Sequence, residues 1–167
     1  MITKTGKKNS FIPFTTDGKM SVVMWDFQPI LTEDGKDVGV GTWKCEYFDK
    51  KMEIDDIKDF ILKYYNDKID EKILSGMVWK DMRVWLSSEN QFNYKAAYDL
   101  AVQTNGKNLP VIFKFGDTNT PIYYQFNTIE ELSDFYLSSM MFIQTTLNEG
   151  WKIKDAINWD LYSNFTK

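Results

Sequence analysis

The side chains through which this protein could do chemistry are carboxylates, lysines and tyrosines, because its 167 residues include no histidine and one cysteine. Without histidine, no imidazole can activate a serine or cysteine nucleophile. A structural zinc site needs four cysteine or histidine ligands, and the chain offers one. Because Cys45 is alone, it forms no disulfide within the chain, and we expect it to be a small buried hydrophobic residue.

Two adjacent acidic pairs, Asp55-Asp56 and Glu130-Glu131, are the first candidates for acid–base work. Both fall where a helix is expected to begin, and neighbouring side chains on a helix do not face each other. The helix dipole favours acidic groups in the first turn, so we interpret both pairs as helix starts. The segment 117–119 (DTN) resembles the start of a calcium loop, but Ile122 and Thr128 stand where that loop needs Gly and Glu.

The glycine motifs that bind phosphate, the P-loop and GxGxxG, are also missing from the sequence. We therefore expect a protein that is not an enzyme. We expect no catalytic, cofactor-binding or metal-binding residues and no cofactor.

A dense polar cluster, Ser87-Ser88-Glu89-Asn90-Gln91, separates a short apolar run from an aromatic and alanine-rich segment. Ser88 and Gln91 have the spacing of a capping box, and Glu89 would lie in the first helical turn. The alternative is a ligand or partner site built on Glu89, Asn90 and Asn93. Beyond the cap, one side of the helix carries Phe92, Ala96 and Leu100. Beside them lie two alanines, Ala97 and Ala101, which allow close approach to a sheet.

The overall charge is −4 with a pI near 4.9, which argues against nucleic-acid binding because phosphate contacts need a basic surface. No apolar run approaches the length of a membrane span, and we expect no membrane association. The first ten residues are polar and lack the apolar core of a signal peptide, so we expect synthesis in the cytoplasm.

Residues 1–20 carry four lysines against one aspartate, a net charge of +3 on an otherwise acidic protein. They are expected to form an N-terminal arm, either frayed or docked on an acidic neighbour. Ser21–Phe27 and Val38–Phe48 are rich in strand-forming residues and flank a turn at Asp34-Gly35. They predict a β-hairpin that needs some surface to cover it, because a two-stranded hairpin alone is marginal in water.

The rest of the chain alternates between helical and extended patterns. Helices are predicted over 53–75, with a possible break at Asn66-Asp67, and over 88–104, 129–149 and 151–159, with glycines 76, 106 and 150 as stops. Strands are predicted over 82–86, 111–115 and 122–126. The last residues are expected to fray. The result is an α+β fold, a small antiparallel sheet packed with helices and preceded by the arm and hairpin. We divide it into residues 1–50 and 51–167.

The helix predicted over 129–149 is apolar around much of its circumference. Its main stripe contains Ile129, Leu132, Tyr136, Met140, Ile143 and Leu147, and further apolar side chains lie off that stripe. Such a helix is either the central core helix or one that presents a side to another subunit.

Four sequence blocks carry a family resemblance: VWLSSENQFNYKAAYDLA, LPVIFKFG, PIYYQFNTIEELSDFY and LNEGWKIKDAINW. They resemble an uncharacterised helical domain of tail-fibre-linked and other virion proteins of bacteriophages, including crAss-like phages of gut Bacteroidales. The resemblance covers roughly residues 53–160 and leaves the N-terminal arm and hairpin outside. That family has no established catalytic residues to carry over.

The resemblance implies a structural virion protein, an oligomeric component or adaptor of a head or tail fibre. Its expected partners are a second copy of itself, with a dimer favoured, and other fibre or capsid proteins. Its expected location is the virion. The N-terminal hairpin is then a docking or oligomerisation element. The alternative is a carbohydrate-binding module for host-surface glycans, suggested by the six tryptophans, most of which we expect in the core.

Overall fold

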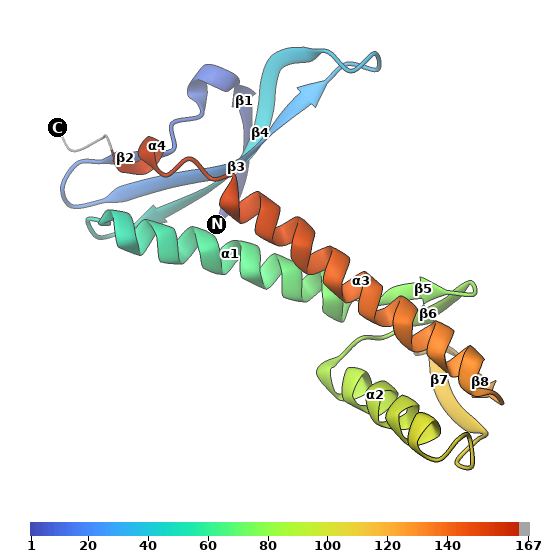
Figure 1. The fold of residues 1–167 in the computed structure, drawn as a ribbon. Helices are drawn as coiled ribbons and strands as arrows, with labels where there is room; N and C mark the ends of the chain where they lie inside the picture. Colours follow the sequence, from blue (N-terminus) through green and yellow to red (C-terminus); the bar gives the residue numbers. More distant parts are fainter. Residues whose placement is uncertain (164–167) are drawn as a thin grey trace. The chain divides into compact units, whose positions relative to one another are not determined.

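The computed structural model describes residues 1–163, which form the predicted α+β fold. All strand pairs are antiparallel, and helices separate or follow them along the chain (Figure 1). Residue contacts divide the chain into two compact units. Unit 1 comprises Met1–Tyr64 with residues 156–163, and unit 2 comprises Tyr65–Asp155. No helix within residues 1–163 combines the length and apolarity that a bilayer crossing requires.

Unit 1 is built on a four-stranded sheet with the strand order β1–β4–β3–β2. Its elements are β1 (Ile2–Lys7), the short 3-10 helix η1 (Lys8–Ser10), β2 (Phe14–Thr16), β3 (Ser21–Leu31) and β4 (Asp37–Phe48). The predicted hairpin is confirmed as β3–β4. Its turn includes Gly35, whose φ of +80° is readily adopted by glycine.

The N-terminal segment belongs to this sheet. β1 pairs with β4 over its whole length, from Ile2 opposite Cys45 to Lys7 opposite Val40. The terminal ammonium also forms an ion pair with Glu46. The expectation of a frayed arm is therefore wrong, because the backbone partners of β1 come from a strand far along the chain that local composition does not reveal.

One face of the sheet is covered by the first half of helix α1 (Ile54–Leu74). Ile57 and Ile61 are fully buried there. The ring of Trp25 on β3 meets Phe60 edge-on, with 5.0 Å between ring centroids, and meets Tyr64 at 5.3 Å. This packing places residues 54–64 in unit 1, so the boundary between units differs from the one predicted after residue 50.

Trp43 lies on the other face of the sheet. Its neighbour Lys44 is paired with Trp25 on the face that α1 covers, and successive residues of a strand point to opposite faces. The Trp43 indole packs against Phe11 and Phe27, at centroid distances of 5.9 Å and 6.2 Å. Cys45, two residues along the same face, is fully buried, as predicted. The short helix α4 (Asp160–Ser163) also belongs to unit 1, where the Tyr162 hydroxyl donates a hydrogen bond to the Met24 carbonyl at 3.0 Å.

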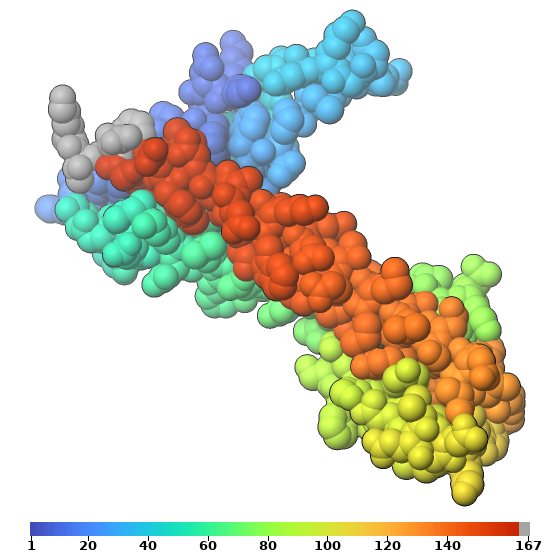
Figure 2. Space-filling model, viewed as in Figure 1, coloured from blue at the N-terminus to red at the C-terminus, as the bar shows by residue number. Residues whose placement is uncertain are grey.

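The far end of the β3–β4 ribbon extends beyond the rest of its sheet. β1 reaches only to Val40 of β4, so the residues nearer the turn pair with each other alone. Residues 28–39 are exposed throughout, including Ile30, Leu31 and Val38. Figure 2 shows this end, in light blue and cyan, standing clear of the other strands of unit 1.

Helix α1 is continuous, so Asn66 and Asp67 do not break it. Asp55 and Asp56 lie in its first turn, as predicted. Its end at Gly76 is also confirmed, since the Gly76 amide donates to the Ile73 carbonyl at 3.0 Å and its φ is +84°.

Unit 2 joins the second half of α1 to two hairpins and two helices. Its elements are β5 (Met77–Trp79), β6 (Met82–Val84), α2 (Ser88–Gln103), β7 (Val111–Asp117), β8 (Thr120–Phe126) and α3 (Ile129–Asp155). The β7–β8 hairpin is confirmed with the predicted orientation, because Phe115 is fully buried while Ile112 and Lys114 are exposed. The core of unit 2 is aromatic, and Phe115, Phe126 and Phe135 are among its fully buried side chains.

Helix α3 continues through Gly150 to Asp155, which corrects the predicted stop at Gly150 and the predicted separate helix over 151–159. Gly150 is buried against α1. A Cβ placed there would lie 2.2 Å from the Ile69 Cδ1 atom. The glycine therefore allows α1 and α3 to approach closely. In a sequence, a glycine with this role cannot be distinguished from one that ends a helix.

Candidate functional site

The polar cluster that precedes α2 caps the helix, but with a register one residue earlier than predicted. Ser87, not Ser88, is the N-cap, and its hydroxyl accepts from the Asn90 amide at 3.2 Å. The Gln91 side chain donates to the Leu86 carbonyl at 2.7 Å and does not complete a box with Ser88. The Asn90 side chain donates to the Trp85 carbonyl at 3.2 Å. Asn90 and Gln91 therefore fasten the loop between β6 and α2.

The corrected cap predicts different effects for the two adjacent serines. Ser87→Ala should lower the free energy of unfolding by about 1 kcal/mol, because it removes the hydroxyl that accepts from the Asn90 backbone N–H. Ser88→Ala should change it by less than about 0.5 kcal/mol. Urea denaturation of both variants measures the difference. Equal losses would contradict the assignment of Ser87 as the cap.

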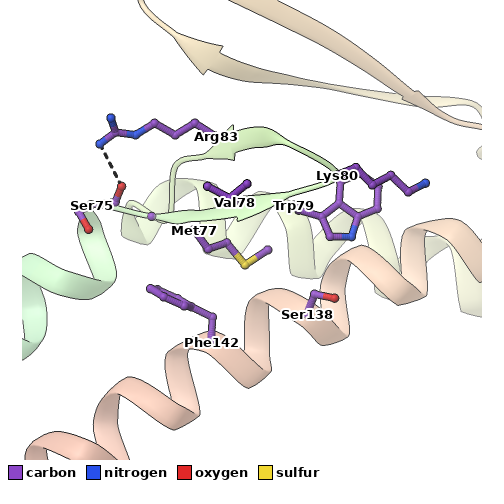
Figure 3. Close-up of a pocket in the computed structure, with 9 residues that line it drawn as sticks. Ser75, Met77, Val78, Trp79, Lys80, Arg83, Ser138 and Phe142 are labelled. Atoms are coloured by element: carbon purple, nitrogen blue, oxygen red, sulfur yellow. Dashed lines mark hydrogen bonds between the residues drawn. The ribbon is translucent and has the colours of Figure 1, made fainter.

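Unit 2 contains an open cleft of about 760 Å³. It lies along the β5–β6 hairpin, which the sequence predicted only in part as one strand over 82–86. Nine residues line it: Ser75, Gly76, Met77, Val78, Trp79, Lys80, Arg83, Ser138 and Phe142. Figure 3 shows Met77 and Phe142 directed into the space between the hairpin and α3.

The hairpin turn consists of Lys80 and Asp81, with φ of +46° and +60°. Positive φ at both central residues is the signature of a two-residue type I′ turn, and it pairs Trp79 with Met82. Such turns usually contain Asn or Gly, so the Lys-Asp sequence gave no signal for it. The turn holds the Lys80 ammonium 4.5 Å from the centre of the Trp79 ring.

Lys80, Tyr124 and Glu131 form a cluster at this end of the hairpin. The Lys80 Nζ atom lies 3.0 Å from the Tyr124 hydroxyl and 3.0 Å from Glu131 Oε1. The Tyr124 hydroxyl also donates to Glu131. These three residues come from three elements, so the cluster ties the β5–β6 turn to β8 and to the start of α3. Glu131 therefore has a tertiary role in addition to its predicted place in a first turn.

The electrostatics of this cluster stabilise the charged forms of both ionised groups. The Tyr124 hydrogen bond, followed by that of Lys80, lowers the pKa of Glu131 below its ordinary 4.5. The same two partners raise the pKa of Lys80 above 10.5. Both shifts move the groups away from neutral pH, whereas a general acid or base works best with a pKa near the operating pH. The arrangement suits a structural ion pair.

This cluster predicts a measurable change in the pKa of the Glu131 carboxyl. In Tyr124→Phe, that pKa should rise toward 4.5, because the variant loses the Tyr124 hydrogen bond that contributes most to lowering it. The pair's contribution to stability should be present above the unfolded pKa and lost as the pH falls through the folded pKa. NMR titration of the Glu131 carboxyl carbon measures the shift. The exposed neighbour Tyr123→Phe is the matched control, and equal values in the two variants would refute the assignment.

Arg83, the other cation of the cleft, is also held by neighbours. Its guanidinium lies 4.1 Å from the centre of the Trp85 ring. It also donates to the Ser75 carbonyl at 3.3 Å, as Figure 3 shows. Asp117 of the rejected calcium motif is 3.6 Å from it. Within residues 1–163, no group of three or more His, Cys, Asp or Glu side chains is arranged to hold a metal ion.

No family model, curated protein or solved structure matches this chain.

Proposed function

We propose that this protein is a non-enzymatic structural protein of a bacteriophage virion, an oligomeric component or adaptor of a head or tail fibre. It is made in the host cytoplasm and assembles with itself and with other fibre or capsid proteins. The resemblance of residues 53–160 to a phage virion domain supplies the setting. The uncovered end of the β3–β4 ribbon supplies the structural argument.

That ribbon end has the properties of a docking element. Its residues 28–39 extend past the strands that flank the ribbon elsewhere, and two-stranded β-structure is marginal in water unless something covers it. Three large apolar side chains, Ile30, Leu31 and Val38, are 40%, 53% and 49% exposed. Burying such side chains against a partner is favourable by the hydrophobic effect. The other end of the same ribbon packs on α1, so the element is anchored at one end and open at the other.

The cleft in unit 2 is more consistent with a scaffold than with catalysis. Lys80 pairs with Glu131, and Arg83 stacks on Trp85. Both cations of the cleft therefore interact with neighbouring side chains of the protein and hold the β5–β6 hairpin in place.

The decisive experiment is mass spectrometry of purified virions from the phage that encodes this chain, with quantification of its copy number. We expect a fixed, integral number of copies per particle. A chain made during infection but missing from the particle would overturn the proposal.

The ribbon's role is tested by a shortened variant in which residues 30–40 are replaced by a tight Asn-Gly turn, which keeps Pro29 opposite Gly41. This variant should keep the thermal transition of unit 1 but fail to enter virions or to bind the fibre proteins. The control Ile30→Thr, a single change at the same ribbon end, should retain assembly. Normal incorporation of the shortened variant would remove the ribbon from the proposal.

One observation favours the carbohydrate-binding alternative, namely the exposure of Trp151. Three tryptophans are buried, Trp25, Trp43 and Trp79, whereas Trp151 is 46% exposed on α3. An exposed indole can stack on a sugar face. Glycan-array binding that is lost in Trp151→Ala would support this function, and no binding at millimolar sugar would exclude it.

A further inference from the structure

Helix α2 carries an apolar stripe on the side that faces away from its own unit. Phe92 is 70% exposed and Leu100 is 48% exposed, with exposed Ala96 midway between them. The opposite side of the helix holds Tyr94 and Ala101, which are buried in the core. The sequence placed Phe92, Ala96 and Leu100 on one side correctly, but the side that packs inside the protein is the other one.

We propose that α2 pairs in antiparallel fashion with α2 of a second copy of this chain, giving a two-fold symmetric dimer with Ala96 at its centre. This inference deepens the proposed oligomeric function and rests on it, because it names the surface through which two copies associate. Figure 2 shows α2, in yellow-green, lying along the surface of unit 2.

The spacing of the stripe makes it complementary to itself. Phe92 lies four residues before Ala96 and Leu100 lies four residues after it. In an antiparallel pair centred on Ala96, Phe92 of each copy therefore meets Leu100 of the other. A two-fold interface requires this kind of self-matching surface. The small Ala96 side chains meet at the axis and let the two helices approach to about 8 Å, the lower end of helix packing distances.

Charges beside the stripe favour the same arrangement. Lys95 and Asp99 lie four residues apart on one flank of the helix, where they form an ion pair within the chain. The antiparallel symmetry brings the corresponding flanks of both copies together, so Lys95 of one copy lies beside Asp99 of the other. The two Lys95 side chains lie on this flank on either side of the axis, each between the Asp99 carboxylates of the two copies, and at the ends Glu89 meets the neutral Gln103. A parallel pair would instead place this charged flank against Asn93 and Ala97, and it would align the helix dipoles unfavourably.

The expected dimer is weak. A helix of 16 residues is about 24 Å long, so one helix pair buries less than the roughly 1,200 Å² typical of stable interfaces. We expect a dissociation constant on the order of 10–100 μM. In a virion, neighbouring copies are held close together, and the high effective concentration would make such a contact sufficient.

Sedimentation velocity of the full-length protein over a concentration range spanning this value tests the surface. We expect wild type to shift from monomer to dimer, and Phe92→Glu and Leu100→Glu each to raise the dissociation constant at least tenfold. Leu137→Glu is the matched control, because Leu137 is 54% exposed on α3 and lies outside the stripe. Loss of the dimer in the control alone, or no effect of either stripe variant, would overturn the proposal.

Cysteine cross-linking tests the direction of the helices. Ala96→Cys should form a disulfide-linked dimer under mild oxidation, because the two-fold axis passes beside this position. Gln103→Cys lies on the same exposed side but about 10 Å along the axis from the centre, so an antiparallel pair separates its two copies by about 21 Å. Cross-linking at both positions would indicate a parallel pair, and cross-linking at neither would reject the interface. The buried native Cys45 does not compete.

These outcomes are separable from those for the proposed function. A dimer that survives both stripe variants overturns only the assignment to α2. A wild-type protein that stays monomeric at every concentration removes the self-association itself. Presence in the virion is decided independently by mass spectrometry.

Discussion

Phe135→Ala should lower the free energy of unfolding by about 3–5 kcal/mol, because it removes a fully buried ring from the aromatic core of unit 2. Phe135 projects from α3 into the centre of unit 2 and is fully buried. Its ring lies 4.9 Å from the centre of Tyr94 and 5.2 Å from those of Trp79, Phe115 and Phe126. Its removal leaves a cavity lined by rigid rings that cannot collapse easily.

Urea denaturation followed by near-ultraviolet circular dichroism measures this loss, because the rings around Phe135 report on unit 2. The midpoint should fall while the slope with urea is preserved. Phe92→Ala is the matched control at low micromolar protein, and it should cost less than about 0.5 kcal/mol since its ring is mostly solvent-exposed. Equal costs for the two phenylalanines would mean that the aromatic cluster around Phe135 is not the core of unit 2.

Gly76→Ala should cost at least about 3 kcal/mol, for two reasons that act together. The backbone at Gly76 has a φ of +84°, which a side chain disfavours by about 1–2 kcal/mol. A Cβ there would also lie 2.0 Å from the Val84 carbonyl oxygen. That oxygen belongs to the backbone of β6, so it cannot move aside as a flexible side chain would. Relief of the clash requires the join between α1 and β5 to shift.

Gly106→Ala is a control that isolates the backbone term, because Gly106 is in the same unit and has a φ of +79°. The three atoms nearest to its added Cβ would be side-chain carbons of Ile129 and Leu109 at 3.5–3.6 Å, an ordinary contact distance. We expect a cost of about 1 kcal/mol, since the lower entropy of the unfolded chain offsets part of the strain. Thermal or urea unfolding of both variants gives the comparison. Similar losses would show that the contact with Val84 does not matter.

The two acidic pairs that the sequence offered as candidates for acid–base chemistry have structural roles. The pair at residues 55–56 begins α1, and the pair at 130–131 begins α3. Glu131 adds the contact with Lys80 and Tyr124, which the sequence could not reveal because the three residues lie on separate elements. The polar cluster before α2 shows the same limit on a finer scale. Its composition predicted a cap, but Ser87 and Ser88 are both capable of that role and the incoming chain direction selects Ser87.

Where local sequence was misleading, a distant part of the chain supplied the missing contact. Gly150 has the sequence character of a helix stop, yet α3 continues through it, and the absence of a side chain leaves room for Ile69 of α1. Residues 2–7 have the composition of a frayed tail, yet β4 provides them with a complete set of pairing partners. Neither contact can be predicted from the residues next to it in the sequence, because each partner lies far along the chain.

The sequence by itself determined the α+β class, the β3–β4 and β7–β8 hairpins, the starts of α1 and α3 and the burial of Cys45. These features follow from side-chain periodicity, turn residues and dipole-favoured charges, which act over a few neighbouring positions. Only the tertiary structure decided which side of α2 is buried, where unit 1 ends within α1 and which end of the β3–β4 ribbon is uncovered. Those outcomes depend on which surfaces remain exposed after distant elements have packed. Because the hydrophobic effect is non-directional, a local sequence pattern does not specify which distant surface will cover an apolar side chain.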